Sequence, residues 1–120
     1  MAKILAVDDA TSIRQMVALT LKGAGHNVTE ASDGKQALDI AQRQSFDLVL
    51  TDVNMPTMDG LTLTRELRKL AAFRFTPILV LTTEAGAEKK QEGRAAGATG
   101  WLVKPFNPDQ LLATVNKVLR

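Results

Sequence analysis

Acidic, hydroxyl and amine side chains follow the apolar runs of this 120-residue sequence at four widely separated places. They are Asp8, Asp9, Asp52, Thr82, Thr83 and Lys104. Three carboxylates held close together repel one another, and a bound divalent cation relieves that repulsion most simply. All-oxygen ligands suit Mg²⁺ or Mn²⁺, and Mg²⁺ commonly uses a few carboxylates while it retains several waters. If these side chains meet in the fold, they predict a divalent-cation site.

The same set of groups predicts phosphoryl chemistry. The cation and the Lys104 ammonium would neutralise charge on the transferring oxygens, and the Thr82 hydroxyl would donate a hydrogen bond to one of them. Asp52 is the expected nucleophile, since carboxylates form acyl phosphates. Alternatively, acidic residues at strand ends only cap helices or solvate loops. That alternative suits a single Asp better than a set spread over four strand ends.

Alternating strand and helix patterns explain how the chain would bring these groups together. Five apolar runs, each followed by a helical pattern, lie at residues 4–7, 28–31, 46–51, 78–81 and 101–103. Such alternation predicts an α/β fold, a five-stranded parallel sheet with helices on both faces. The run 46–51 has apolar residues on both of its faces, as in a strand covered on both sides. Ligands bind such sheets beyond the carboxyl ends of the strands, at the edge where all these groups lie.

Signals in the helices are more mixed. Thr11 or Ser12 is the expected N-cap of the first helix, and Pro108 opens the last one. The helix expected over 87–96 has no large apolar residue and contains Gly93, so it is either weakly held and easily shifted or a plain surface helix with Ala-rich packing. His26 lies far from the acidic residues in this layout and is expected to be structural.

Length and composition predict a single ordinary globular domain spanning residues 1–120, and no further domain is expected. Apolar residues make up 45% and charged residues 23% of the chain, and cysteine is absent. No stretch resembles a signal peptide or a membrane span, so a cytoplasmic protein without membrane insertion is expected. A net charge of +2 with scattered basic residues and few aromatics argues against nucleic-acid binding.

Four segments, spread in order along the whole chain, carry a family resemblance. They are residues 4–9, 51–60, 81–84 and 97–106. In these segments the chain resembles response-regulator receiver domains, and most closely the stand-alone chemotaxis regulators of the CheY type. The resemblance implies a flavodoxin-like sheet with the strand order 2-1-3-4-5. It also implies a phosphorylation switch of a two-component system and not a conventional enzyme.

Roles at the acidic site follow from the resemblance by position. It implies that Asp52 is the phosphoacceptor and that Asp9 and Asp52 ligate Mg²⁺ directly, with Mn²⁺ as a possible substitute. Asn54 would add its backbone carbonyl, and Asp8 would act through a metal-bound water.

Further roles lie around that site. The resemblance implies that Lys104 pairs with the phosphoryl group, that Thr82 moves towards it, and that the Lys104-Pro105 bond is cis, a form that X–Pro bonds adopt readily. Asn54 and Glu84 occupy the positions that influence phosphoryl lifetime in this family.

Trp101 is the main departure from the family pattern, in which many chemotaxis regulators carry Tyr at this position. An indole keeps the bulk of the ring, but its N–H only donates. Trp101 either relays the switch, as the family's Tyr does, or is a half-buried packing residue that never moves. Thr83 occupies the position where a small side chain leaves the phosphoryl site accessible.

Partners also follow from the resemblance. They are a sensor histidine kinase, a target on the face formed by the fourth helix, fifth strand and fifth helix, such as a flagellar-motor component, and a phosphatase. Lys89, Lys90 and Arg94 make that face basic, which would favour an acidic partner segment, and the chain is expected to be a monomer. A phosphate sink or an adaptor in another pathway remain alternatives. A Mg²⁺-dependent phosphohydrolase is more remote, since Asn54 stands where such enzymes usually carry a second catalytic Asp.

Overall fold

The structure is a computed structural model that describes residues 2–55, 57–83 and 87–119. Within these ranges, five strands form one sheet in the order β2-β1-β3-β4-β5, and every neighbouring pair is parallel. The strands are β1 (Lys3–Val7), β2 (Asn27–Ala31), β3 (Leu48–Asp52), β4 (Ile78–Thr82) and β5 (Gly100–Val103). The predicted five-stranded parallel sheet and its strand order are confirmed.

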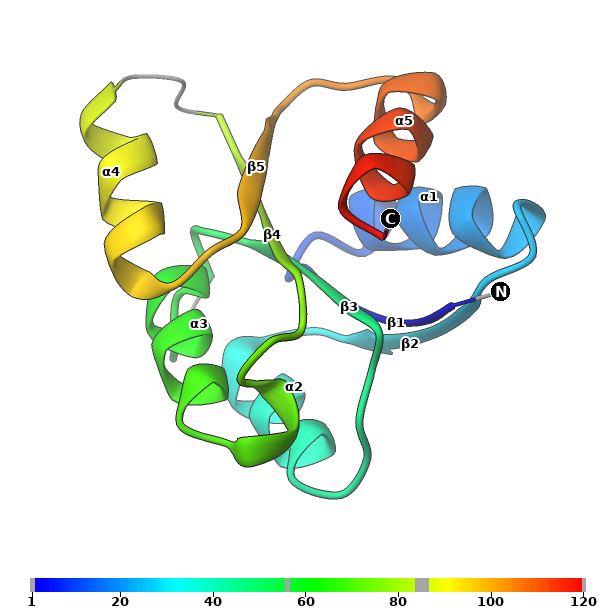
Figure 1. The fold of residues 1–120 in the computed structure, drawn as a ribbon. Helices are drawn as coiled ribbons and strands as arrows, with labels where there is room; N and C mark the ends of the chain where they lie inside the picture. The colour runs from blue at the N-terminus through cyan, green and yellow to red at the C-terminus, as the bar shows by residue number, and fades with distance from the viewer. Residues whose placement is uncertain (1, 56, 84–86, 120) are drawn as a thin grey trace.

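Helices cover both faces of the sheet. They are α1 (Thr11–Gly23), α2 (Gly34–Ala41), α3 (Gly60–Arg68), α4 (Ala87–Ala96) and α5 (Pro108–Val118), with a short 3₁₀ helix η1 (Ala71–Phe73). Figure 1 shows α1 and α5 on one side of the sheet and α2, α3 and α4 on the other. None of the described helices is long and apolar enough to span a membrane.

Two hydrophobic clusters, one on each side of the sheet, hold these layers together. One lies between the sheet and α2 and α3, and the other lies between the sheet and α1 and α5. Every residue of β3 and β4 is buried, as the apolar runs predicted. The predicted start of the third strand was two residues early. Phe46 is buried, but it precedes the strand and packs near Phe73, with 6.4 Å between ring centroids.

The prediction for the N-cap of α1 was wrong. The N-cap is Ala10, whose side chain makes no cap hydrogen bond, so Thr11 and Ser12 lie inside the first turn. The reason is that the Ala10 N–H donates to Asp8 Oδ1 at 2.9 Å, which fixes the loop after β1 and starts the helix early. His26 has the predicted structural role, because its Nδ1 accepts a hydrogen bond from the Ala2 N–H at 3.0 Å.

Candidate functional site: an acidic cluster at the end of the sheet

Three carboxylates meet where the strand order reverses, between β1 and its neighbour β3. One oxygen from each of Asp8, Asp9 and Asp52 lies within 4.8 Å of the others. Asp8 and Asp52 are only 2% and 8% exposed, whereas Asp9 is exposed. Ladder pairing from Ile4 with Leu48 to Val7 with Thr51 places the ends of β1 and β3 side by side, which keeps the backbones of Asp8 and Asp52 close together. The sequence therefore placed these three residues correctly at one site.

Lys104 adds a cation to this cluster from the chain just after β5. Its Nζ lies 3.0 Å from Asp52 Oδ1 and 3.2 Å from Asp8 Oδ2, and its side chain is 13% exposed. One ammonium thus bridges two buried carboxylates. Three carboxylates and one ammonium leave an excess of negative charge, which suits a divalent cation with oxygen ligands. The residues present therefore fit Mg²⁺.

Burial and local charges act on Asp52 in opposite directions. Loss of solvent is the largest effect and raises the pKa of Asp52 above its usual value, and the neighbouring Asp8 carboxylate raises it further. The hydrogen bond and the charge of Lys104 lower the pKa, as does the Val53 N–H, which donates to Asp52 Oδ1 at 2.9 Å. Lys104 therefore favours the ionised form that a nucleophilic carboxylate needs.

Gly60 packs closely against the site in a way that the sequence did not reveal, because Asp59-Gly60 is also an ordinary turn signal. The first turn of α3 packs directly on the end of β3, and the Gly60 N–H donates to the Val53 carbonyl at 2.9 Å. A Cβ at Gly60 would lie 2.1 Å from the Asp52 carbonyl oxygen and 3.1 Å from Val53 Cα. A residue without a side chain is thus required to seat the backbone of Asp52.

Two hydroxyl residues stand at the end of β4, the strand next to β3. Thr82 is the last residue of β4 and is 8% exposed, whereas the next residue, Thr83, is exposed. A small cavity of about 30 Å³ has Asn54, Thr82, Lys90 and Trp101 among its lining residues. Thr82 and Trp101 therefore border the same space.

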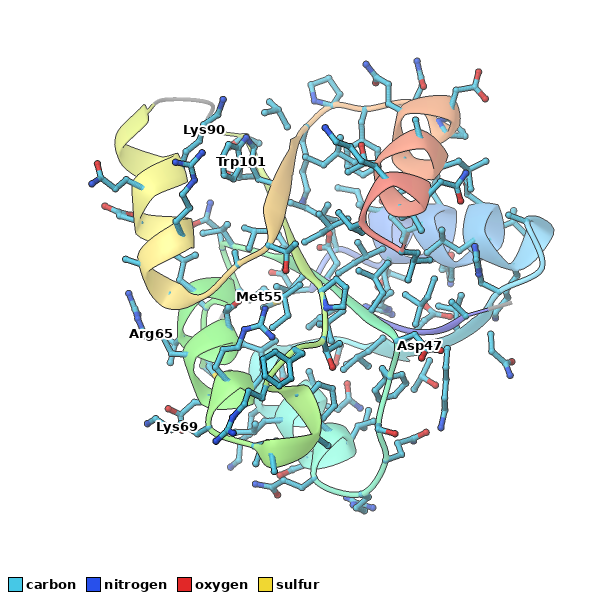
Figure 2. The ribbon with its side chains drawn as sticks, in the orientation of Figure 1. Asp47, Met55, Arg65, Lys69, Lys90 and Trp101 are labelled. Carbon is cyan, nitrogen blue, oxygen red and sulfur yellow. The ribbon has the colours of Figure 1, made fainter. Side chains whose placement is uncertain are left out.

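Trp101 on β5 is half-buried and lies opposite Val80 of β4. Two cations from α4 approach its ring. Lys90 Nζ lies 5.0 Å and Arg94 Cζ 5.4 Å from the ring centroid, and Figure 2 shows Lys90 beside Trp101. Each contact is a cation–π interaction that stabilises the present position of the indole.

Other sequence-predicted positions are placed only in part. Asn54 is exposed on the loop after β3, and the Lys104-Pro105 peptide bond is cis. Glu84 lies outside the described residues, as does the side chain of Lys89.

Fold and site together define the class of the protein. It is a flavodoxin-like α/β domain with an acidic cluster at the switch point of its sheet, and a lysine side chain pairs with two of the three carboxylates. The family model for the response regulator receiver domain matches residues 4–116, so the chain belongs to the response-regulator receiver family.

Similar proteins agree with this assignment. The solved structure of chemotaxis protein CheY4 of Vibrio cholerae is 58% identical, with a TM-score of 0.96 and 98% of each chain covered. Chemotaxis protein CheY-3 of Vibrio cholerae is 39% identical over 117 residues, which are 97% of this chain and 90% of that protein. A probable transcriptional regulator, ycf27 of Porphyridium aerugineum, is also 39% identical over 118 residues. This chain spans only 48% of that regulator's length.

Membership of the family carries general properties. Receiver domains are phosphorylated by histidine kinases, bind downstream targets and serve as signalling switches of two-component systems, not as conventional enzymes. The relatives belong to more than one kind of pathway, since one set is chemotactic and another is a probable transcriptional regulator.

Proposed function

We propose that the protein is a phosphorylation switch in which Asp52 accepts a phosphoryl group from a sensor histidine kinase in a Mg²⁺-dependent reaction. The observation that carries the proposal is the seating of Asp52. Its carboxylate is buried beside two other carboxylates, and the Lys104 ammonium lies 3.0 Å from one of its oxygens. A buried acid held next to a cation is typical of a functional group and unusual in a surface loop.

In the proposed reaction an Asp52 carboxylate oxygen attacks the phosphorus of a phosphohistidine. The new O–P bond forms as the N–P bond breaks, and the imidazole leaves with the electron pair of that bond. The Val53 N–H and Lys104 Nζ hold the Asp52 carboxylate in one orientation, and Lys104 is close enough to pair with the incoming phosphoryl oxygens.

Mg²⁺ would be held by Asp9 and Asp52, by the backbone carbonyl of Asn54, and by Asp8 through a water. When bound, the ion supplies positive charge that neutralises the phosphoryl oxygens during transfer. Asp8 suits an indirect role, because its Oδ1 already accepts the Ala10 N–H and its Oδ2 contacts Lys104.

For output, we propose that phosphorylation changes the affinity of the α4–β5–α5 face for a protein target. Thr82 would move towards the phosphoryl group, and Trp101, on the same cavity, would follow. Thr83 would leave the phosphoryl site open to solvent and to a phosphatase, and Asn54 and Glu84 would tune the phosphoryl lifetime. The pathway that the CheY relatives favour is chemotaxis, with a flagellar-motor component as the target.

Mg²⁺ and beryllofluoride binding to the native chain and to Asp52→Asn tests the proposal. Trp101 is the single tryptophan, so its fluorescence reports on the site, and calorimetry measures binding directly. We expect a saturable response to beryllofluoride that requires Mg²⁺ and that Asp52→Asn abolishes. Asp39→Asn, the same change at an exposed position of α2, is the matched control and should behave as the native chain.

Two outcomes separate the parts of this proposal. Absence of Mg²⁺ and beryllofluoride binding by the native chain would refute the phosphorylation switch. Binding without any change in fluorescence would retain the acidic site and refute Trp101 as a relay.

Pull-down of purified motor components by the native chain, with and without beryllofluoride, tests the chemotactic role. A native chain that exchanges phosphate with a kinase but never captures a motor component would favour the phosphate sink.

A further inference from the structure

Arg14 occupies an unfavourable place for a cation. It lies in the first turn of α1, where the partial positive charge of the helix disfavours a basic side chain. That turn has no acidic residue and no side-chain cap to offset the charge. The Arg14 side chain is nevertheless only 16% exposed, so contacts elsewhere must hold it.

Those contacts lead directly to the loop that carries two members of the acidic cluster, Asp8 and Asp9. Arg14 Nη1 donates to the Asp8 backbone carbonyl at 2.8 Å, and Arg14 Nε donates to Glu30 Oε1 on β2 at 3.1 Å. The Arg14 N–H donates to the Ala10 carbonyl at 3.0 Å, while the Ala10 N–H donates to Asp8 Oδ1. Arg14 therefore bonds to both ends of the segment 8–10, to the Asp8 carbonyl through its side chain and to the Ala10 carbonyl through its main chain. The bond from the Ala10 N–H to Asp8 Oδ1 also closes this segment, which carries Asp9.

From this geometry we infer that Arg14 is a positioning residue for the cation site and that Glu30 is its counter-ion. Arg14 holds the main chain of Asp8, which fixes where the Asp8 and Asp9 carboxylates lie. Glu30 orients the guanidinium by a charge-assisted bond and cancels its charge, which would otherwise repel a divalent cation nearby. This inference rests on the proposed function, because it assumes that the cluster binds Mg²⁺.

Two substitutions separate positioning from charge. Arg14→Lys keeps the positive charge, but one ammonium cannot reproduce the fork that reaches Asp8 and Glu30 together. Glu30→Gln keeps the shape and an acceptor oxygen but leaves the guanidinium charge uncompensated. Glu66→Gln is the matched control, since Glu66 on α3 forms an ion pair with Lys69 at 2.7 Å, and α3 lies on the other side of the sheet from α1 (Figure 1).

The experiment measures the Mg²⁺ dissociation constant by calorimetry at low and high salt, with thermal unfolding of each variant without Mg²⁺. We expect Arg14→Lys to bind Mg²⁺ about tenfold more weakly, as is usual when a group that orients a metal ligand is lost. We expect Glu30→Gln to bind on the order of fivefold more weakly at low salt, with the ratio to the native chain closing at high salt. Glu66→Gln should match the native chain.

The outcome that overturns the inference is native Mg²⁺ affinity, within about twofold, in Glu30→Gln and in any Arg14→Lys that folds. Lowered unfolding temperatures with that result would make the pair merely structural. If Arg14→Lys does not fold, Glu30→Gln still decides, because it preserves the shape of the contact. A native chain that binds no Mg²⁺ refutes the proposed function itself, which is a distinguishable result.

Discussion

Replacing Gly60 by Ala tests whether α3 seats the phosphoacceptor. The added Cβ would lie 2.1 Å from the Asp52 carbonyl oxygen, and its contact with the Asp52 carbonyl carbon would be 2.9 Å. Ordinary contacts between such atoms are more than 3 Å, so the start of α3 and the end of β3 must separate by roughly 1 Å. The atoms that must move are backbone atoms, which a rotamer change cannot relieve.

Both stability and function should respond. Overpacking of this kind costs about 1–3 kcal/mol, which in a domain of this size lowers the unfolding temperature by about 4–12 °C. Displacement of a reacting group by about 1 Å reduces rates on the order of 100-fold. We therefore expect Gly60→Ala to unfold earlier and to bind beryllofluoride weakly or not at all.

Thermal unfolding and beryllofluoride titration, followed through Trp101 fluorescence, provide the assay. Gly23→Ala is the control, because nothing lies within 4 Å of a Cβ at the end of α1 and Ala favours the helix by up to about 1 kcal/mol. A Gly60→Ala protein with native unfolding temperature and native beryllofluoride affinity would refute the claim that this contact seats Asp52.

Three further predictions concern charges. Because burial raises the pKa of Asp52, this group contributes stability below the pKa of the unfolded chain, near pH 4, and loses it as the pH rises through the folded pKa. Without metal, Asp52→Asn should therefore have a higher unfolding temperature than the native chain at pH 7, and the difference should shrink towards pH 4 in thermal scans. A difference that grows on acidification would contradict this prediction. Lys104→Met should lose about 1–3 kcal/mol in urea unfolding without metal, since two carboxylates lose their partner, and should bind Mg²⁺ more tightly in calorimetry. Arg68 donates to the carbonyls of Phe73, Thr76 and Gly97, so Arg68→Lys should lose about 2 kcal/mol and exposed Arg65→Lys almost nothing; equal losses would refute this role of the fork.

The acidic cluster could be predicted from the sequence because parallel strands share one edge. An apolar run followed by a polar residue marks a strand end, and four such ends carried Asp8, Asp52, Thr82 and Lys104 to one place. No knowledge of side-chain packing was needed for that step. Element ends were less predictable, since the loop contact at Asp8 Oδ1 decided where α1 begins, and capping preferences pointed to later residues.

Residues that support the cluster from outside could not be predicted in this way. Gly60 shows its role only once α3 lies against β3, and Arg14 shows its role only once α1 crosses over to β2 and meets Glu30. Such contacts depend on distances between elements, which periodicity and strand order do not specify.

The site departs from the rules that the rest of the fold obeys. Elsewhere apolar side chains fill the space between the layers, but the ends of β1 and β3 bring buried carboxylates together with one ammonium between them. On a flexible loop such groups would move apart, whereas here ladder pairing, Gly60 and Arg14 keep them together. The excess negative charge therefore persists unless a proton or a cation neutralises it, and burial already raises the pKa of Asp52 in the first of these directions. Under the proposed function, Mg²⁺ is the ligand that neutralises it.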